Sequence, residues 1–276
     1  MPFWKSENPT SASFPSFRNH KGRPKGWPFL AHFIRTMAFT FLSADWCNLI
    51  FANYPIDRAV LQPLVPHGTE LDDYNGVCFG SLVGFNFEKV RMLGEVPVPF
   101  HTEFEEFNLR FYVRRKTEEG WQRGVVFVKE IVPKPAIVWV ARTLYGEPYE
   151  ARSMRHTWQF RDDKQHIRYE WQVGDDWNYI DVEASRVGEQ AQPGSEEWFI
   201  TENYWGYTAR GTKHTSEFEV VHDRWQIYPV SQFDVRCDVA QLYGPQFAPF
   251  FTGPPSSVFL ADGAPVTIRS GQDIKA

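Results

Sequence analysis

The alternation of apolar and polar residues along the chain predicts a protein built mainly from β-strands. Short runs rich in β-branched and aromatic residues alternate with turn-forming residues, which is the pattern of strands joined by tight connections. Their regular spacing suits a closed or nearly closed antiparallel barrel, so we predict a mainly β fold of the β-rich α+β kind. The predicted strands are 76–87, 106–115, 124–131, 156–160, 165–173, 179–185, 204–209, 217–222, 227–237 and 257–260.

The chain also contains patterns that indicate a few short helices. Residues 55–64 place a potential N-cap, Asp57, before apolar residues at helical spacing. Residues 135–146 begin with proline and end with glycine, and their apolar residues fall on one face. A third short helix is predicted at 195–201.

The distribution of proline and charge along the chain predicts the domain organisation. Residues 1–28 carry five prolines among polar residues, which favours an extended arm. The apolar stretch 29–51 is interrupted by charged and polar residues, so we interpret it as buried core rather than a membrane span. Because no linker or repeat follows, we predict one domain over 29–276.

Composition limits the classes of binding partner and the cellular compartment that we expect for this protein. A net charge of -5 argues against nucleic acid and anionic membranes, which attract positively charged surfaces. The three cysteines form no CxxC pair and the eight histidines show no metal-ligand spacing, so we predict neither metal nor cofactor. With no secretion signal visible, we expect a cytoplasmic protein with a small-molecule ligand; a homo-oligomer stays possible.

One predicted strand carries the most informative side chains. Period-two alternation separates four polar residues from four apolar ones, and the polar set is Glu106, Asn108, Arg110 and Tyr112. The polar face can be an ordinary solvated surface with a weak ion pair. In a barrel it can instead face the lumen, where carboxylate, amide and guanidinium groups would orient an anionic or carbonyl ligand.

Six stretches of the chain, taken in order, resemble the uncharacterised bacterial family called domain of unknown function 2071, or YqjF-like. The resemblance extends over about residues 37–269. The stretches are WCNLIFANY at 46–54, GSLVGF at 80–85, EFNLRFYV at 106–113, RGVVF at 123–127, YGEPY at 145–149 and TENY at 201–204.

This family is distantly similar to acetoacetate decarboxylases, whose barrel carries a short helix and a Gly-x-Pro-Lys-Lys turn with a Schiff-base lysine. In this chain Tyr149 and Glu150 occupy the two lysine positions. Neither side chain can form an imine, so the resemblance implies the fold without the decarboxylase chemistry. Lys129 and Lys134 are nearby in sequence but lie outside that turn. The resemblance also implies that Glu106 matches an active-site glutamate.

Four further residues are candidates with an equally plain structural explanation. Arg142 could bind a ligand carboxylate or extend to solvent. Tyr149 could donate a hydrogen bond to a ligand or simply pack. Glu202 and Tyr204 belong to a motif of the family but could also serve as local cap or ion-pair partners. His222 we interpret as part of a turn rather than an acid or base.

These residues lead to three functional hypotheses. The first is a protein that binds a small organic acid or carbonyl compound without Schiff-base lysine. The second is a lysine-independent lyase-like enzyme, for lyase, enolisation or hydration chemistry, with Glu106 as acid or base. The third is an interaction module that presents Trp198, Trp205 and Trp225 on its surface. The expected catalytic residues are Glu106 and Tyr149, and the expected ligand-binding residues are Asn108, Arg110, Arg142, Glu202 and Tyr204.

Overall fold

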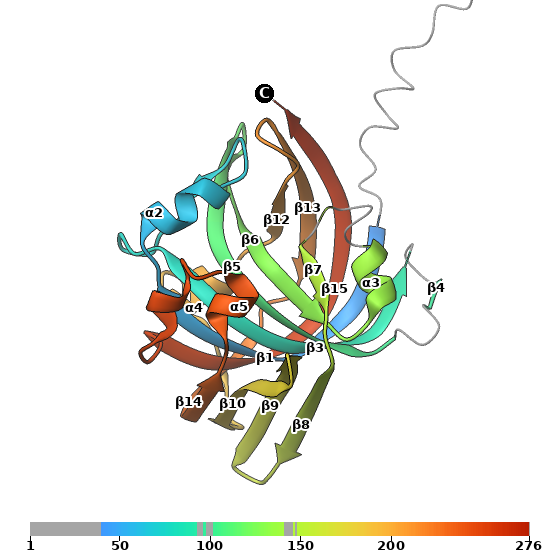
Figure 1. The fold of residues 1–276 in the computed structure, drawn as a ribbon, viewed down its shortest axis with the longest axis vertical. Coiled ribbons are helices and arrows are strands. Elements are labelled where there is room, and N and C mark those ends of the chain that lie inside the picture. Colours follow the sequence, from blue (N-terminus) through green and yellow to red (C-terminus); the bar gives the residue numbers. More distant parts are fainter. Residues whose placement is uncertain (1–39, 93–95, 98–101, 141–145, 147, 276) are drawn as a thin grey trace, which may run out of the picture. The chain divides into compact units, whose positions relative to one another are not determined.

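The computed structural model describes residues 40–92, 96–97, 102–140, 146 and 148–275, and its centre is a closed β-barrel (Figure 1). Seven strands follow one another around the barrel in the order β1-β3-β5-β6-β12-β13-β15, and β15 pairs with β1 to close it. These strands are β1 Thr40–Pro55, β3 Phe79–Met92, β5 Phe104–Thr117, β6 Gly120–Val132, β12 Trp205–Ala209, β13 His214–His222 and β15 Ser257–Lys275.

A second group of strands continues the sheet from β15 and covers part of the outside of the barrel. Its order is β14-β10-β9-β8, and the β8–β9 hairpin extends away from the barrel in Figure 1. These strands are β14 Gln226–Arg236, β10 Asp176–Ser185, β9 Lys164–Val173 and β8 Met154–Phe160. Short edge strands complete the sheet: β2 Glu70–Leu71, β4 Val96–Pro97, β7 Tyr149–Ala151 and β11 Glu189–Gln190.

The helices are short and lie at the ends of strands. The α-helices are α2 Arg58–Leu61, α3 Pro135–Val140, α4 Glu196–Thr201 and α5 Val239–Tyr243, and the 3-10 helices are η2 Gln62–Leu64 and η4 Ala248–Phe251. The predicted cap is confirmed, since the Asp57 carboxylate accepts from the Ala59 backbone N–H at 2.8 Å. Ser195 caps α4 in the same way through the Trp198 N–H. The sequence did not indicate α5 or η4.

All ten predicted strands are present, and three features of the barrel differ from prediction. The N-terminal apolar stretch contributes strand β1, which the sequence analysis interpreted only as buried core, and β15 is much longer than predicted. The barrel is not antiparallel throughout, because β12 pairs with β6 in parallel. The predicted arm at 1–28 and the second half of the helix predicted at 135–146 lie outside the described residues.

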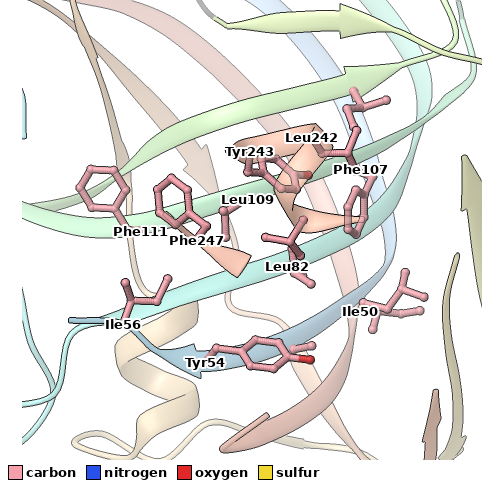
Figure 2. Close-up of a cluster of buried hydrophobic side chains, with 14 of the residues drawn as sticks. Ile50, Tyr54, Ile56, Leu82, Phe107, Leu109, Phe111, Leu242, Tyr243 and Phe247 are labelled. Atoms are coloured by element: carbon pink, nitrogen blue, oxygen red, sulfur yellow. The ribbon is translucent and has the colours of Figure 1, made fainter. Parts of the chain in front are cut away.

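Side-chain alternation along the barrel strands produces two separate hydrophobic cores. On β5, Phe107, Leu109, Phe111 and Val113 belong to the outer core, as predicted. The outer core is completed by β9, β10 and α5, and Figure 2 shows Leu242 and Tyr243 of α5 among these side chains. The inner core lies within the barrel and includes Phe51, Val83, Phe85, Tyr112 and Phe259. The polar residues of β5 therefore share the lumen side with the inner core.

A bulge in β6 changes which of its residues face the lumen. Leu109 of β5 pairs with Lys129, whereas Arg110 pairs with Phe127, so Val128 is an extra residue in the strand. Phe127 packs with the inner core, and Val128 packs with the outer core. After the bulge the phase is reversed, since Ile131 is in the outer core and Val132 in the inner one. Glu130 consequently lies on the lumen side.

An ion pair outside the barrel joins β8 to β5 and makes stability depend on pH. His156 Nδ1 lies 2.8 Å from Glu105 Oε1. The hydrogen bond to Glu105 raises the pKa of His156 above 6.5, although burial opposes it. Burial alone would raise the pKa of Glu105, but the hydrogen bond from His156 outweighs it and the pKa is lowered. A raised histidine pKa stabilises the fold below its unfolded pKa, and that contribution is lost as pH rises through the folded pKa.

We therefore expect the unfolding free energy of the wild type, relative to that of His156→Gln, to fall as the pH rises from about 6.5, the ordinary pKa of histidine, through the raised pKa of His156. Urea denaturation followed by circular dichroism at several pH values measures this difference. A constant difference between the two proteins across that range would contradict the role of the His156–Glu105 pair. His214→Gln is the comparison variant, because His214 is also ion-paired but is more exposed than His156.

Candidate functional site

The barrel encloses a cavity of about 210 Å³, and a group of polar side chains lies together on one of its walls. The polar wall comes from neighbouring strands: β5 supplies Glu106, Asn108 and Arg110, β6 supplies Glu130 and β7 supplies Tyr149. Glu106 is 2% exposed and Arg110 is 7% exposed, so the solvated interpretation of this strand face does not hold. Strand pairing explains the cluster, because Asn108 is paired with Glu130 and Glu130 with Tyr149.

Glu106 is held by two side chains of this wall. Asn108 Nδ2 donates to Glu106 Oε1 at 2.9 Å, and the Tyr149 hydroxyl donates to Oε2 at 3.1 Å. Both carboxylate oxygens therefore have a donor, and the carboxylate is oriented within the wall. A buried carboxylate beside a phenol and a second glutamate is an arrangement that can transfer protons.

Arg110 is a buried cation that lacks a carboxylate partner in the described part of the chain. Its Nη2 donates to the Ile200 carbonyl at 3.3 Å, and its guanidinium carbon lies 4.9 Å from the centre of the Phe51 ring. Its Nε has no hydrogen-bond partner among the described residues. A buried charge is costly unless it is paired, so this arginine favours an anion in the cavity.

Most of the remaining cavity wall is apolar and rich in aromatic rings, and its other polar lining residues are Thr201, Asn203, His222, Arg269 and Ser270. Trp46 of β1 contacts Phe85, with ring centres 5.2 Å apart, and Phe87, at 5.9 Å. Trp225 lies 6.2 Å from Trp46 and stacks on His222 at 4.5 Å. Further apolar lining residues include Val90, Phe104, Phe127, Ile137, Phe218, Val220 and Ile268.

Glu202 and Tyr204, which we predicted to bind ligand, are not among the residues that line this cavity. The Tyr204 hydroxyl donates to Glu202 Oε2 at 2.7 Å, and Arg224 Nε donates to the same oxygen at 3.2 Å. Burial and the bond to Glu202 raise the pKa of Tyr204 to about 12. The alternate residues of this motif, Thr201 and Asn203, line the cavity instead.

His222 combines the predicted turn contact with a place on the cavity wall. Its Nδ1 lies 2.9 Å from the carbonyl oxygen of Asp223, as expected of a histidine that satisfies a turn. Its ring also stacks on Tyr204 and lines the cavity. Burial lowers the pKa of His222, which favours the neutral ring.

The start of strand β7 presents a phenol to the cavity and an ion pair to the outside. Tyr149 lines the cavity, whereas Glu150 binds Lys129 at 2.8 Å and Arg152 at 2.6 Å. Lys129 is thus engaged on the opposite side of β6, and the described part of the wall contains no lysine. Arg142 lies outside the described residues.

His, Cys, Asp and Glu side chains form no cluster of three suited to a metal ion in the part of the chain that the structure describes. Among the same residues, no helix has the length and hydropathy needed to span a membrane.

Comparison with known proteins identifies the family. The sequence profile of DUF2071, described as an uncharacterized conserved protein, matches residues 43–265. This chain belongs to the DUF2071 family. It is also similar to the uncharacterized protein YqjF of Bacillus subtilis, with 33% identity over 110 residues, which are 40% of this chain. The match spans 44% of YqjF, less than half of its length.

Solved structures similar to this DUF2071 protein share its barrel. Acetoacetate decarboxylase from Legionella pneumophila has a TM-score of 0.55 at 10% identity, covering 86% of this chain and 87% of that one. An acetoacetate decarboxylase-like enzyme from Sphingomonas wittichii RW1 has a TM-score of 0.56 at 12% identity, covering 86% and 93%. The enduracididine biosynthesis enzyme MppR has a TM-score of 0.58 at 10% identity, covering 85% and 88%. The predicted acetoacetate decarboxylase-like barrel is therefore confirmed as a fold.

Several wall residues of this DUF2071 protein were not identified from the sequence. Glu130 was missed because the bulge at Val128 reverses the alternation that period-two counting assumes. Trp46 was missed because its strand was not recognised. Thr201 and Asn203 could have been identified, since they alternate with Glu202 and Tyr204 in the TENY motif. The sequence analysis selected only Glu202 and Tyr204, the charged and aromatic pair.

Proposed function

We propose that this protein binds a small organic acid or carbonyl compound inside its barrel, with Arg110 as the anchor for an anionic group and without an imine. The observation that carries the proposal is the buried Arg110 guanidinium, which lines the cavity and forms no ion pair with a described residue. An anionic ligand would supply the missing charge and a charge-assisted hydrogen bond.

Two further observations support this proposal. Asn108 Oδ1 and Arg110 Nε are buried and have no hydrogen-bond partner among the described residues. A buried polar atom without a partner costs about 1–3 kcal/mol, so a group of them is typical of a site that binds a polar molecule. In addition, MppR, with the same fold, has been solved in complex with pyruvate, a keto acid.

Replacing Arg110 tests the proposal directly. We expect carboxylates found by a thermal-shift screen to bind Arg110→Met about tenfold to a hundredfold more weakly than wild type, since a hydrogen bond to a charged group contributes about 1.5–3 kcal/mol. Isothermal titration calorimetry measures the affinities. Arg155→Met, at an exposed arginine of β8, is the matched control and should bind as wild type does.

Two outcomes would contradict the proposal. One is equal affinity of wild type and Arg110→Met for every carboxylate that binds. The other is a covalent adduct after borohydride treatment with a keto acid, because only an imine would be trapped.

A second candidate function, a lysine-independent enzyme, is favoured by one specific contact. The Tyr149 hydroxyl donates to Glu106 Oε2, and Glu130 lies on the neighbouring strand of the same wall. Glu106 would serve as acid or base and Tyr149 as a hydrogen-bond donor in lyase, enolisation or hydration chemistry. Glu106→Gln keeps the shape of the side chain and removes its basicity. Lost turnover with retained ligand affinity would support the enzyme, and unchanged turnover would exclude Glu106 as its base.

The third hypothesis, an interaction module, is less well supported, because two of its three tryptophans line the cavity. Trp225 is 4% exposed and lines the cavity, as does the partly buried Trp205.

For location, we propose the cytoplasm, and the three free thiols Cys47, Cys78 and Cys237 are consistent with a reducing compartment.

A further inference from the structure

We infer that the ligand of the cavity is an aromatic carboxylic acid, with its carboxylate on Arg110 and its ring against the aromatic wall that contains Trp46. This inference rests on the proposed function and narrows its ligand to one chemical class. It is argued from the size of the cavity, the continuity of the aromatic wall with Arg110, and the hydrogen-bonding atoms that the wall offers.

The size of the cavity suits one ring and a short acidic substituent. Its volume of about 210 Å³ exceeds the roughly 150 Å³ of an apolar protein cavity known to bind benzene. A C2 to C4 keto acid would leave most of the apolar wall without contacts. An acid with one six-membered ring would fill the cavity more completely and bury its apolar surface, which is the main driving force for binding.

The aromatic wall continues along the cavity from a point near the guanidinium. Arg110 lies over Phe51, a buried ring that does not itself line the cavity, and the Phe51 ring centre is 6.1 Å from that of Trp225. Trp225 is in turn 6.2 Å from Trp46, and Trp46 contacts Phe85 edge-on at 5.2 Å. A carboxylate held by Arg110 would therefore direct its substituent along a series of rings. Rings packed at such angles add about 0.5–1.5 kcal/mol per pair beyond the burial of area, which a saturated ring cannot recover.

Three unpartnered donors on this wall can bind an acceptor on the ligand, and two acceptors, Asn108 Oδ1 and Asn203 Oδ1, are likewise buried without a hydrogen-bond partner among the described residues. Arg110 Nε, Trp46 Nε1 and Trp225 Nε1 are buried donors without a hydrogen-bond partner among the described residues. All three residues line the cavity. A carboxylate offers several lone pairs to such donors, whereas an ammonium group offers none.

A set of four matched compounds tests the inference by calorimetry. We expect phenylacetate to bind tightest, with phenylacetamide about tenfold to a hundredfold weaker because it lacks the charge. Cyclohexylacetate, of similar size and equal charge, should bind about twofold to tenfold more weakly than phenylacetate. Acetoacetate should bind more weakly than either ring acid because it buries less apolar surface.

Substitution of the wall then identifies the residues responsible for the preference. Trp46→Leu should remove the preference for phenylacetate over cyclohexylacetate, while Trp121→Leu, at a half-exposed tryptophan of β6 that does not line the cavity, should preserve it. If Trp46→Leu fails to fold, Phe85→Leu replaces it, because Phe85 lines the same wall.

The outcomes separate this inference from the proposed function. If cyclohexylacetate or acetoacetate binds as tightly as phenylacetate, or if both wall variants retain the aromatic preference, the inference is overturned while anion binding at Arg110 stands. If no carboxylate binds, including acetoacetate, then the proposed function and the inference both fail. A ring preference that depends on Trp46 or Phe85, together with a charge preference that depends on Arg110, supports both.

Discussion

Trp171→Ala is expected to lower the free energy of unfolding by about 3–5 kcal/mol, the cost of removing a large aromatic side chain from a packed core. Trp171 of β9 is fully buried, and its ring stacks on Phe107 of β5 with centres 3.6 Å apart. This contact attaches the β8–β9–β10 layer to the outside of the barrel. Since domains are typically stable by about 5–15 kcal/mol, urea denaturation should show a large shift of the midpoint.

The control for this variant is Trp139→Ala. Trp139 is 68% exposed on α3, so its replacement should change stability by no more than about 0.5 kcal/mol. A loss below about 1 kcal/mol for Trp171→Ala would contradict the role assigned to the outer core. Trp171→Phe, which keeps a ring against Phe107, should lose less stability than Trp171→Ala.

Gly124→Ala is expected to weaken the junction at which β6 meets β12, with a loss of about 1–3 kcal/mol from overpacking. A Cβ at Gly124 would overlap the backbone oxygen of Trp205 and lie 2.8 Å from Cε2 of Tyr207. The two strands are joined in parallel by the pairs Trp205–Gly124 and Gly206–Val125. The backbone shift that relieves this overlap would therefore separate β6 from β12 in the wall of the barrel.

Hydrogen exchange measures this effect locally, and denaturation measures it globally. The amides of β12 should exchange faster in Gly124→Ala than in wild type. Gly253→Ala is the matched control, because a Cβ there would meet no atom within 4 Å. Equal exchange of β12 in Gly124→Ala and wild type would show that the neighbouring strands accommodate the methyl group.

Period-two alternation on β5 was sufficient to predict which of its residues share a face. Phe107, Leu109 and Phe111 lie in the outer core, and Glu106 and Arg110 on the opposite side line the cavity. The pattern could not distinguish lumen from solvent by itself, since both place polar residues on one face. The choice depends on strands distant in sequence that close the barrel around β5.

Long-range pairing also explains what the sequence did not reveal. Strand β1 contains charged and polar residues, and its partners β3 and β15 must both be present before its apolar side chains are buried. Strand β15 continues past Pro265 because it pairs with β1 and β13 over most of its length. Local propensity is weak at both places, and the tertiary contacts decide the structure.

The extra residue Val128 has a consequence for how this type of barrel can diversify. Without the bulge, unbroken alternation from Phe127 would turn the amine of Lys129 into the lumen and move the carboxylate of Glu130 outside. The sides taken by Lys129 and Glu130 therefore depend on the bulge itself. Deletion of Val128 would remove the bulge and leave both residues on their present sides, because their pairing with Leu109 and Asn108 is unchanged, whereas pairing without a bulge and with Val128 retained would exchange an acidic lumen group for an amine.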